Sequence, residues 1–308
     1  MSITYTLFLF FSGLLGLIVG SFINVLTLRW PDDGRSLKIR QITSGRSHCP
    51  KCHQTLKWID LIPVLSFIFL RRRCRYCHEK ISWQYPVVEI IMGLVFSGVS
   101  YTVLNINFFR YYLFSDFRAH FWILAIILLW FFFSALLIAL SIIDLKKYLL
   151  PDQLLFPGIG IALLADFGFH FLSRSLASGF PHGGLTFLGS YADSLVLLFS
   201  PIVSYVLGAV VLAGFLFLLY FFSHGRAMGF GDVKLAIFIG LILGLFGGIL
   251  SFMISFIIGA IVSLFIIIFK RKRLNDAIPF GPFLTLGVFF VIFLGEAIVN
   301  FYFSLFKG

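Results

Sequence analysis

The sequence has few charged residues, because Asp, Glu, Lys and Arg together make up only 12% of its 308 residues. A soluble domain carries about twice that fraction, so an ordinary soluble globular protein is excluded, as is a disordered chain. The four cysteines are too few for a disulfide scaffold, and the glycines follow no collagen-like period. What the chain has instead is 41 Phe, 60% hydrophobic residues and a mean hydropathy of +1.02. Most of its core is therefore expected to lie in lipid.

The apolar residues form runs that are long enough to cross a bilayer, which takes about 20 residues per helix. The first run is not a signal peptide, because it lacks a basic start and a small-residue cleavage site. The run 235–269 would make one helix of ~53 Å, too long for a ~30 Å core. A break is therefore predicted at Gly247-Gly248. The runs predict an all-α polytopic membrane protein with about eight transmembrane helices: 3–23, 85–105, 121–143, 153–172, 196–223, 234–249, 250–269 and 280–304.

Lysines and arginines gather on one side of these predicted spans. Twenty of the 24 fall in the segments 24–84, 144–152, 224–234 and 270–279. The positive-inside rule places that side in the cytoplasm and both termini outside. The same rule accounts for the net charge of +11, so nucleic acid is not an expected partner. The predicted parts are a first transmembrane helix, a cytoplasmic tetracysteine domain and a seven-helix membrane domain, in the order 1–23, 24–84 and 85–308.

All four cysteines lie in the predicted cytoplasmic domain, as the pairs Cys49/Cys52 and Cys74/Cys77. Two C-x2-C pairs about 20 residues apart are typical of a zinc ribbon, because four thiolates complete one tetrahedral site. The cytoplasm is reducing, which disfavours disulfides. We therefore predict a structural zinc in a zinc-ribbon-like fold. Unmetallated thiols and a redox pair are the alternative interpretations.

Four carboxylates map to the cytoplasmic membrane face: Asp144, Asp152, Asp232 and Glu89. Asp152 and Asp232 open predicted helices, where N-capping is an ordinary role for aspartate. Asp144 ends a predicted helix, where the helix dipole disfavours an anion. That unfavourable position invites a functional explanation. Asp60, in the polar segment, is expected to be a solvated surface residue.

Asp144 and Asp232 suggest the chemistry of an aspartic protease. Two carboxylates that approach closely share one proton, because ionising both is costly. The ionised member then draws a proton from water, and the protonated member donates to the scissile carbonyl oxygen. Gly229 and Gly231 precede Asp232 and would let another chain, such as a substrate strand, come close. From the residues alone, which two of the four carboxylates meet stays open.

Eight short motifs stand in a fixed order along the chain: Gly20-Ser21-Phe22-Ile23-Asn24-Val25 with Arg29 and Pro31, Ser47 through Cys52, Ile62-Pro63-Val64-Leu65-Ser66, Cys74 through Cys77, Tyr85-Pro86-Val87-Val88-Glu89, Asp144 with Leu150-Pro151-Asp152, Met228 through Lys234, and Pro279-Phe280-Gly281-Pro282. In order and spacing they resemble those of the bacterial type IV prepilin peptidases, the leader peptidase and N-methyltransferase family. The similarity covers nearly the whole length.

The resemblance implies cleavage of a short basic leader from prepilins or pseudopilins at the cytoplasmic membrane face. It implies that the catalytic pair is Asp144 and Asp232, supported by a motif made of Gly229, Gly231, Lys234 and the secondary residue Asp152. It also implies methylation of the new N-terminal residue, usually Phe, with S-adenosylmethionine as the donor.

Candidate residues for methyl transfer are Asn24, Arg29 and Glu89. Two of them have equally good structural interpretations, since Arg29 can anchor the first span at the interface and Glu89 can pair with an arginine. The basic segment 24–84 is a poor match for a basic leader, so lipid headgroups are its expected partner.

Two other functions are compatible with intramembrane carboxylates and a cysteine cluster. A transporter would use the carboxylates as a proton relay, but transporters usually show internal repeats, and no convincing repeat is found. A non-catalytic zinc-ribbon scaffold gives no reason for a carboxylate placed against a helix dipole. The resemblance favours the peptidase.

Overall fold

The computed structural model describes residues 3–31, 47–105, 117–175, 201–226, 228–269 and 278–305. Within these ranges the chain is helical and contains no β-strand, only isolated β-bridges in the cysteine-containing segment. It divides into two compact units, residues 1–135 and 136–308. The long helix α6 (Phe117–Lys147) passes from the first unit into the second. The predicted all-α polytopic class is confirmed.

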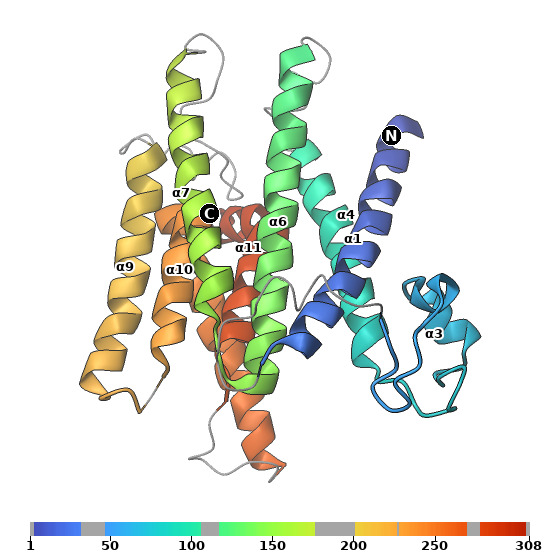
Figure 1. Cartoon of the computed structure of the whole chain (residues 1–308). Coiled ribbons are helices and arrows are strands. Elements are labelled where there is room, and N and C mark those ends of the chain that lie inside the picture. Colours follow the sequence, from blue (N-terminus) through green and yellow to red (C-terminus); the bar gives the residue numbers. More distant parts are fainter. Residues whose placement is uncertain are drawn as a thin grey trace. The chain divides into compact units, whose positions relative to one another are not determined.

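The first unit is built on two apolar helices, α1 (Ile3–Arg29) and α4 (Gln84–Asn105), which pack along each other (Figure 1). Small residues of α1 let the two backbones come close, because a Cβ added to Gly20 would lie 2.7 Å from the Cα of Glu89. The helices also share a hydroxyl–hydroxyl hydrogen bond across their contact. Between α1 and α4, the chain carries the short helices η1 (Trp58–Leu61) and α3 (Leu65–Phe69).

The second unit comprises the end of α6 and four further helices. The helix α10 is its centre, because α7, α9 and α11 all pack against it. Figure 1 shows α9 running beside α10. The bounds are α7 (Asp152–Ser175), α9 (Pro201–Phe222), α10 (Phe230–Ile268) and α11 (Gly281–Ser304).

The helix α10 is 39 residues long and is interrupted at Gly244, whose φ of 70° and ψ of −174° are not helical. A break was required by length, but the predicted position at Gly247-Gly248 is wrong. Gly244 adopts a positive φ without a side-chain clash, and an added Cβ there would lie 3.2 Å from Ser204 Oγ. The same hydroxyl accepts the N–H of Leu245 at 3.5 Å. The Ser204 side chain of α9 thus accepts a hydrogen bond from a backbone N–H beside the helix break, as backbone groups inside a membrane require.

Six helices are long and apolar enough to cross a membrane by length and composition: α1, α4, residues 121–147 of α6, residues 202–222 of α9, α10 and α11. The helix α7 covers the predicted span 153–172 but is not among the six. With α7 and the two arms of α10, all eight predicted spans fall on helices. Residues 196–200 of the predicted span 196–223 lie outside the described part of the chain.

Candidate functional site

Asp144 lies in the last turn of α6, and only 6% of its surface is exposed. Its Oδ2 accepts the backbone N–H of Gly281 at 3.0 Å. Gly281 is the first residue of α11, so the carboxylate sits at the positive end of that helix dipole. The unfavourable dipole of α6 is thereby offset by the favourable dipole of α11, and the hydrogen bond fixes the direction of the carboxylate.

Gly281 is a residue of this site whose role was not predicted from the sequence. A Cβ at this position would lie 2.7 Å from Asp144 Oδ2, which is closer than real Cβ atoms approach. Pro282 follows and has no N–H, so Gly281 supplies the first donor of α11. A glycine directly before a proline at a predicted helix start was the available signal.

Asp232 is the third residue of α10 and is also buried, with 8% of its surface exposed. Gly229 occupies the N-cap position in extended conformation, so the interpretation of Asp232 as the capping residue is wrong. Asp144 lies close enough to Asp232 for the charges of the two carboxylates to interact. Both acidic groups lie at helix ends, Asp144 at the C-terminal end of α6 and Asp232 at the N-terminal end of α10.

The glycine before Asp232 allows a close approach, as predicted, but the neighbour belongs to the same chain. A Cβ on Gly231 would lie 3.0 Å from the Cβ of Leu150, in the segment that joins α6 to α7. An added Cβ on Gly229 would meet nothing nearer than 3.9 Å. The two glycines of the motif therefore have different steric requirements.

Asp152 and Lys234 form an ion pair, with 2.6 Å between Oδ1 and Nζ. The Lys234 ammonium also lies 5.4 Å from the ring centroids of Phe156 and Phe230. The pair links the start of α7 to the N-terminal part of α10, two residues after Asp232. About half of the Asp152 side chain is exposed, so this carboxylate differs in environment from the buried pair.

The two cysteine pairs are built as repeats of one structure. In the first, Cys49 N–H donates to Gln54 O and His53 N–H donates to Cys49 O. The second repeats this pattern 25 residues later, with Cys74 donating to Glu79 O. The histidine after each pair has a positive φ, 55° at His53 and 57° at position 78. Each turn directs its two thiols to the same side.

The four thiols meet in one cluster, with all Sγ atoms of Cys49, Cys52, Cys74 and Cys77 within 4.8 Å of one another. The Sγ atoms of Cys49 and Cys77 are 3.9 Å apart. Tetrahedral coordination with metal–sulfur bonds of about 2.3 Å requires sulfur–sulfur distances of about 3.8 Å. The cluster therefore fits a four-thiolate metal site that leaves no ligand position open.

The thiols differ strongly in acidity. Burial raises the pKa of Cys49, but hydrogen bonds from the N–H groups of Cys52 and Lys51 outweigh it and lower the pKa to about 7. For Cys77, the N–H of Glu79 lowers the pKa, whereas desolvation and the other three thiols raise it to about 12. The four cysteines would all hold a metal as thiolates, so metal binding would release their remaining protons.

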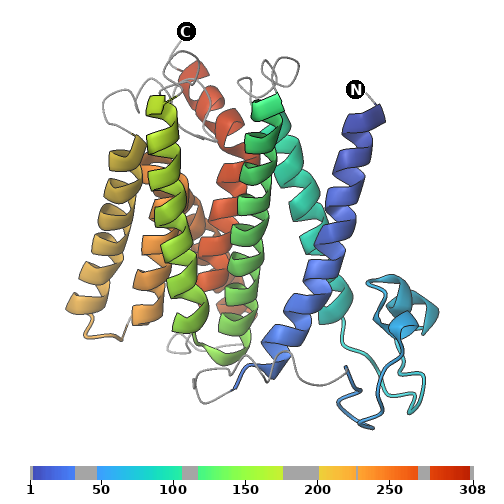
Figure 2. The ribbon, with the colours of Figure 1, turned by 45° about the horizontal axis from the view of Figure 1, so that its top comes forward.

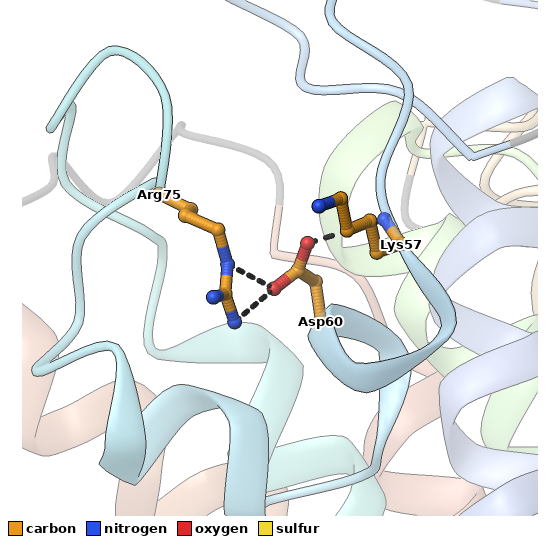
Figure 3. Close-up of polar contacts among 3 residues, drawn as sticks. All are labelled: Lys57, Asp60 and Arg75. Carbon is orange, nitrogen blue, oxygen red and sulfur yellow. Dashed lines mark hydrogen bonds and ion pairs between the residues drawn. The ribbon is translucent and has the colours of Figure 1, made fainter.

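Asp60 is buried and paired, so the prediction of a solvated surface residue is wrong. Its Oδ1 accepts Arg75 Nε at 2.8 Å and lies 2.8 Å from Arg75 Nη2. Its Oδ2 accepts the backbone N–H of Lys57 at 3.1 Å. Figure 3 shows the carboxylate between these two partners. Because Arg75 stands between Cys74 and Cys77, Asp60 ties η1 to the second cysteine turn.

Two of the candidate methyltransferase residues hold the first unit together. Asn24 is buried and donates from Nδ2 to Tyr85 O at 3.1 Å, which joins α1 to the start of α4. Glu89 is also buried, and its Oε2 accepts the N–H of Val64 at 2.8 Å. The described contacts of Glu89 are thus with a backbone amide and the side chain of Ser21 rather than with the expected arginine. Arg29 lies half-buried in the last turn of α1.

Comparison with known proteins gives matches to two families over most of the chain. Residues 14–103 match the bacterial peptidase A24 N-terminal domain, and residues 130–264 match the type IV leader peptidase family. The first match contains the four cysteines, and the second contains Asp144 and Asp232.

Individual relatives cover the same length. A prepilin leader peptidase/N-methyltransferase of Burkholderia pseudomallei is 30% identical over 92% of this chain and 85% of the relative. One of Aeromonas hydrophila is 28% identical over 94% of this chain and 91% of the relative. A type 4 prepilin-like proteins leader peptide-processing enzyme of Escherichia coli is 36% identical over 44% of this chain and 49% of the relative. No solved structure gives a significant match.

Proposed function

Because this chain belongs to the type IV leader peptidase family, we propose that it cleaves the leader peptide of type IV prepilins or related pseudopilins. The observation that carries the proposal is the buried pair Asp144 and Asp232, at the ends of α6 and α10. The basic segments on the same side of the spans support a site at the cytoplasmic face of the bacterial inner membrane. A transporter and a non-catalytic scaffold are not favoured, because relatives over most of the chain carry peptidase names.

In the proposed mechanism, the two aspartates share one proton when substrate binds. The ionised carboxylate removes a proton from a water molecule, whose oxygen attacks the scissile carbonyl carbon. The protonated carboxyl group donates its proton to the carbonyl oxygen, which forms a neutral tetrahedral intermediate. The intermediate collapses when the C–N bond breaks and the leaving amine takes up a proton from the pair. Gly281 keeps Asp144 oriented through these steps with its N–H.

The four-cysteine cluster is proposed to hold one structural zinc. Thiolates are preferred zinc ligands, and four of them exclude a catalytic water from the metal. Zinc would then contribute folding energy to the segment that includes η1 and α3, which has little apolar core of its own.

Methylation of the newly exposed N-terminal residue is the second proposed activity, with S-adenosylmethionine supplying the methyl group. We assign it to the first unit, which contains the cysteine cluster. Asn24 and Glu89 are proposed to act by position, because Asn24 joins α1 to the start of α4 and Glu89 holds the cysteine segment against α4.

The test is to incubate purified protein with a prepilin and to follow the substrate mass. Wild-type protein is expected to remove the leader, and to add a methyl group when S-adenosylmethionine is present. Asp144→Asn and Asp232→Asn should each abolish cleavage, because Asn keeps the shape and removes the shared proton. Asp152→Asn is the matched control and should still cleave. Normal processing by either dyad variant would remove that residue from the proposed pair.

A further inference from the structure

An apolar surface stands out in the cysteine segment, outside the membrane-spanning helices. It belongs to η1 and α3, and within the described part of the chain six large side chains are exposed there. Trp58 has 75% of its surface exposed and Phe69 has 80%. Exposed apolar patches of this kind mark binding surfaces. We call this surface the η1–α3 platform; it consists of Trp58, Ile59, Leu61, Leu65, Ile68 and Phe69.

The platform lies at the depth where α4 enters the membrane. The N-cap residue of α3 is Val64, whose N–H is bound at 2.8 Å by the carboxylate of Glu89. Glu89 is the sixth residue of the spanning helix α4, about 8 Å along its axis at 1.5 Å per residue. Figures 1 and 2 show α3 beside the first turns of α4. This position agrees with lipid headgroups as the expected partner of the basic segment 24–84.

The backbone at Val64 indicates that this position is enforced. Its φ is 60°, which is a strained conformation for a β-branched residue. Strain of this size persists only where the surroundings fix it, and the hydrogen bond that Val64 N–H donates to Glu89 contributes to this here.

A tryptophan marks the same level. Trp83 directly precedes α4, and tryptophan is enriched where helices cross the membrane–water interface. Phe67 of α3 packs on the Trp83 ring with 5.1 Å between centroids. The guanidinium of Arg72 lies 5.3 Å from the same ring. The helix α3, the start of α4 and an arginine thus meet at the Trp83 ring.

Positive charge borders the platform on its polar side. Arg71, Arg72 and Arg73 follow α3 directly and are all exposed. Two of them turn the chain with a positive φ, 50° at Arg71 and 64° at Arg72. Of the two acidic residues in residues 47–84, Asp60 is neutralised by its own ion pair, and Glu79 is an exposed carboxylate of the second cysteine turn. Arg72 donates from Nε to Ile81 O at 3.4 Å, while Arg71 and Arg73 extend the exposed positive charge on either side of it. Each basic side chain near an anionic bilayer contributes about 1 kcal/mol to attraction.

We propose that the η1–α3 platform is a membrane-contact surface that inserts into the headgroup region of the leaflet that α4 enters. Its apolar side chains lie at the boundary of headgroups and acyl chains, and Arg71–Arg73 bind the phosphates of anionic phospholipids. Apolar side chains flanked by basic ones are typical of interfacial membrane segments. This contact would hold the cysteine cluster at the bilayer surface. It does not depend on which residues carry out peptide cleavage.

The first test places the full-length protein in nanodiscs of phosphatidylcholine and phosphatidylglycerol with brominated acyl chains. The emission of Trp58 is obtained as the difference between wild type and Trp58→Phe. We expect bromine close to the headgroup to quench this emission strongly, and aqueous iodide to quench it weakly. Trp130 is buried among helices, so the difference between wild type and Trp130→Phe should respond little to either quencher. Strong iodide quenching without bromine quenching of Trp58 would overturn the proposal.

The second test concerns the arginines. Replacing all three, Arg71→Gln, Arg72→Gln and Arg73→Gln, should reduce bromine quenching of Trp58 in phosphatidylglycerol nanodiscs. In pure phosphatidylcholine the triple replacement should change this quenching little, because that bilayer has no anionic headgroups for the arginines to bind. Lys51→Gln, an exposed charge on the first cysteine turn, is the matched control and should leave both values unchanged. If added prepilin peptide shields Trp58 from iodide while lipid has no effect, the platform binds substrate and the membrane proposal is wrong.

Discussion

The backbone N–H of Gly281 donates a hydrogen bond of 3.0 Å to the carboxylate of Asp144, across 137 positions in the sequence. This contact places the first turn of α11 directly against the last turn of α6. It also leaves no room for a side chain at position 281. Asp144 is thus held by a helix that contributes no acidic group to the site.

We predict that Gly281→Ala strongly impairs leader cleavage without preventing membrane insertion. The added methyl group would push the Asp144 carboxylate from its place, and small displacements of a catalytic group cost about 100-fold in rate. Initial cleavage rates of purified protein measure the effect. Gly160→Ala on α7 is the control, since an added Cβ there would meet nothing within 4 Å, and its rate should stay close to that of wild type. Equal rates for Gly281→Ala and wild type would show that the observed contact does not position Asp144.

The ion pair between Asp152 and Lys234 should contribute little to stability. Both side chains are partly exposed, and exposed pairs are typically worth about 0.2–1 kcal/mol. A double-mutant cycle of Asp152→Asn and Lys234→Met, followed by thermal unfolding in detergent, measures the coupling. A coupling of several kcal/mol would instead assign the pair a central structural role. Cleavage by Asp152→Asn should persist in either case.

Purified protein should carry about one zinc per chain. Serine at any one of Cys49, Cys52, Cys74 or Cys77 should lower the zinc content and loosen the cysteine segment, because metal binding and folding are coupled. Metal analysis and limited proteolysis report the two effects. His78→Asn is the control, since His78 is outside the cluster and Asn tolerates its positive φ. Freshly prepared wild-type protein without zinc would contradict this prediction.

Asp60→Ala should weaken zinc retention, although Asp60 is not a ligand. Removing it leaves Arg75 without its partner between two of the cysteines, and changes in residues that support metal ligands typically cost about 10- to 100-fold in affinity. Competition with a chelator measures the change. Glu79→Gln, an exposed carboxylate of the second cysteine turn, should retain zinc like wild type. Equal retention by both variants would argue against a supporting role for Asp60.

Loss of the aspartate pair should leave methyl transfer intact. The pair lies in residues 136–308, whereas the cysteine cluster lies in residues 1–135. The double variant Asp144→Asn, Asp232→Asn is given a cleaved pilin with a free N-terminal Phe, and methylation is followed by mass spectrometry. Complete loss of methylation, with S-adenosylmethionine binding unimpaired, would mean that both activities use the aspartates.

The sequence by itself was sufficient for the family and for the helical membrane fold, and both predictions are confirmed. Long apolar runs and the cysteine spacing act locally, because a bilayer selects each span by its own hydropathy and a C-x2-C turn aims its two thiols without distant help. The clustering of the four thiols agrees with that expectation. The catalytic role of Asp144 and Asp232 stays a prediction.

Only the tertiary structure decided which residues far apart in the chain meet. The break in α10 falls at Gly244 rather than at Gly247-Gly248, because the hydroxyl of Ser204 on α9 can serve the freed backbone there. Asp60 is buried because Arg75 neutralises it. The contact of Asp144 with Gly281 depends on how α6 packs against α11. Such pairings are set by helix packing and by the need to satisfy each buried polar group, and no local pattern of residues encodes them.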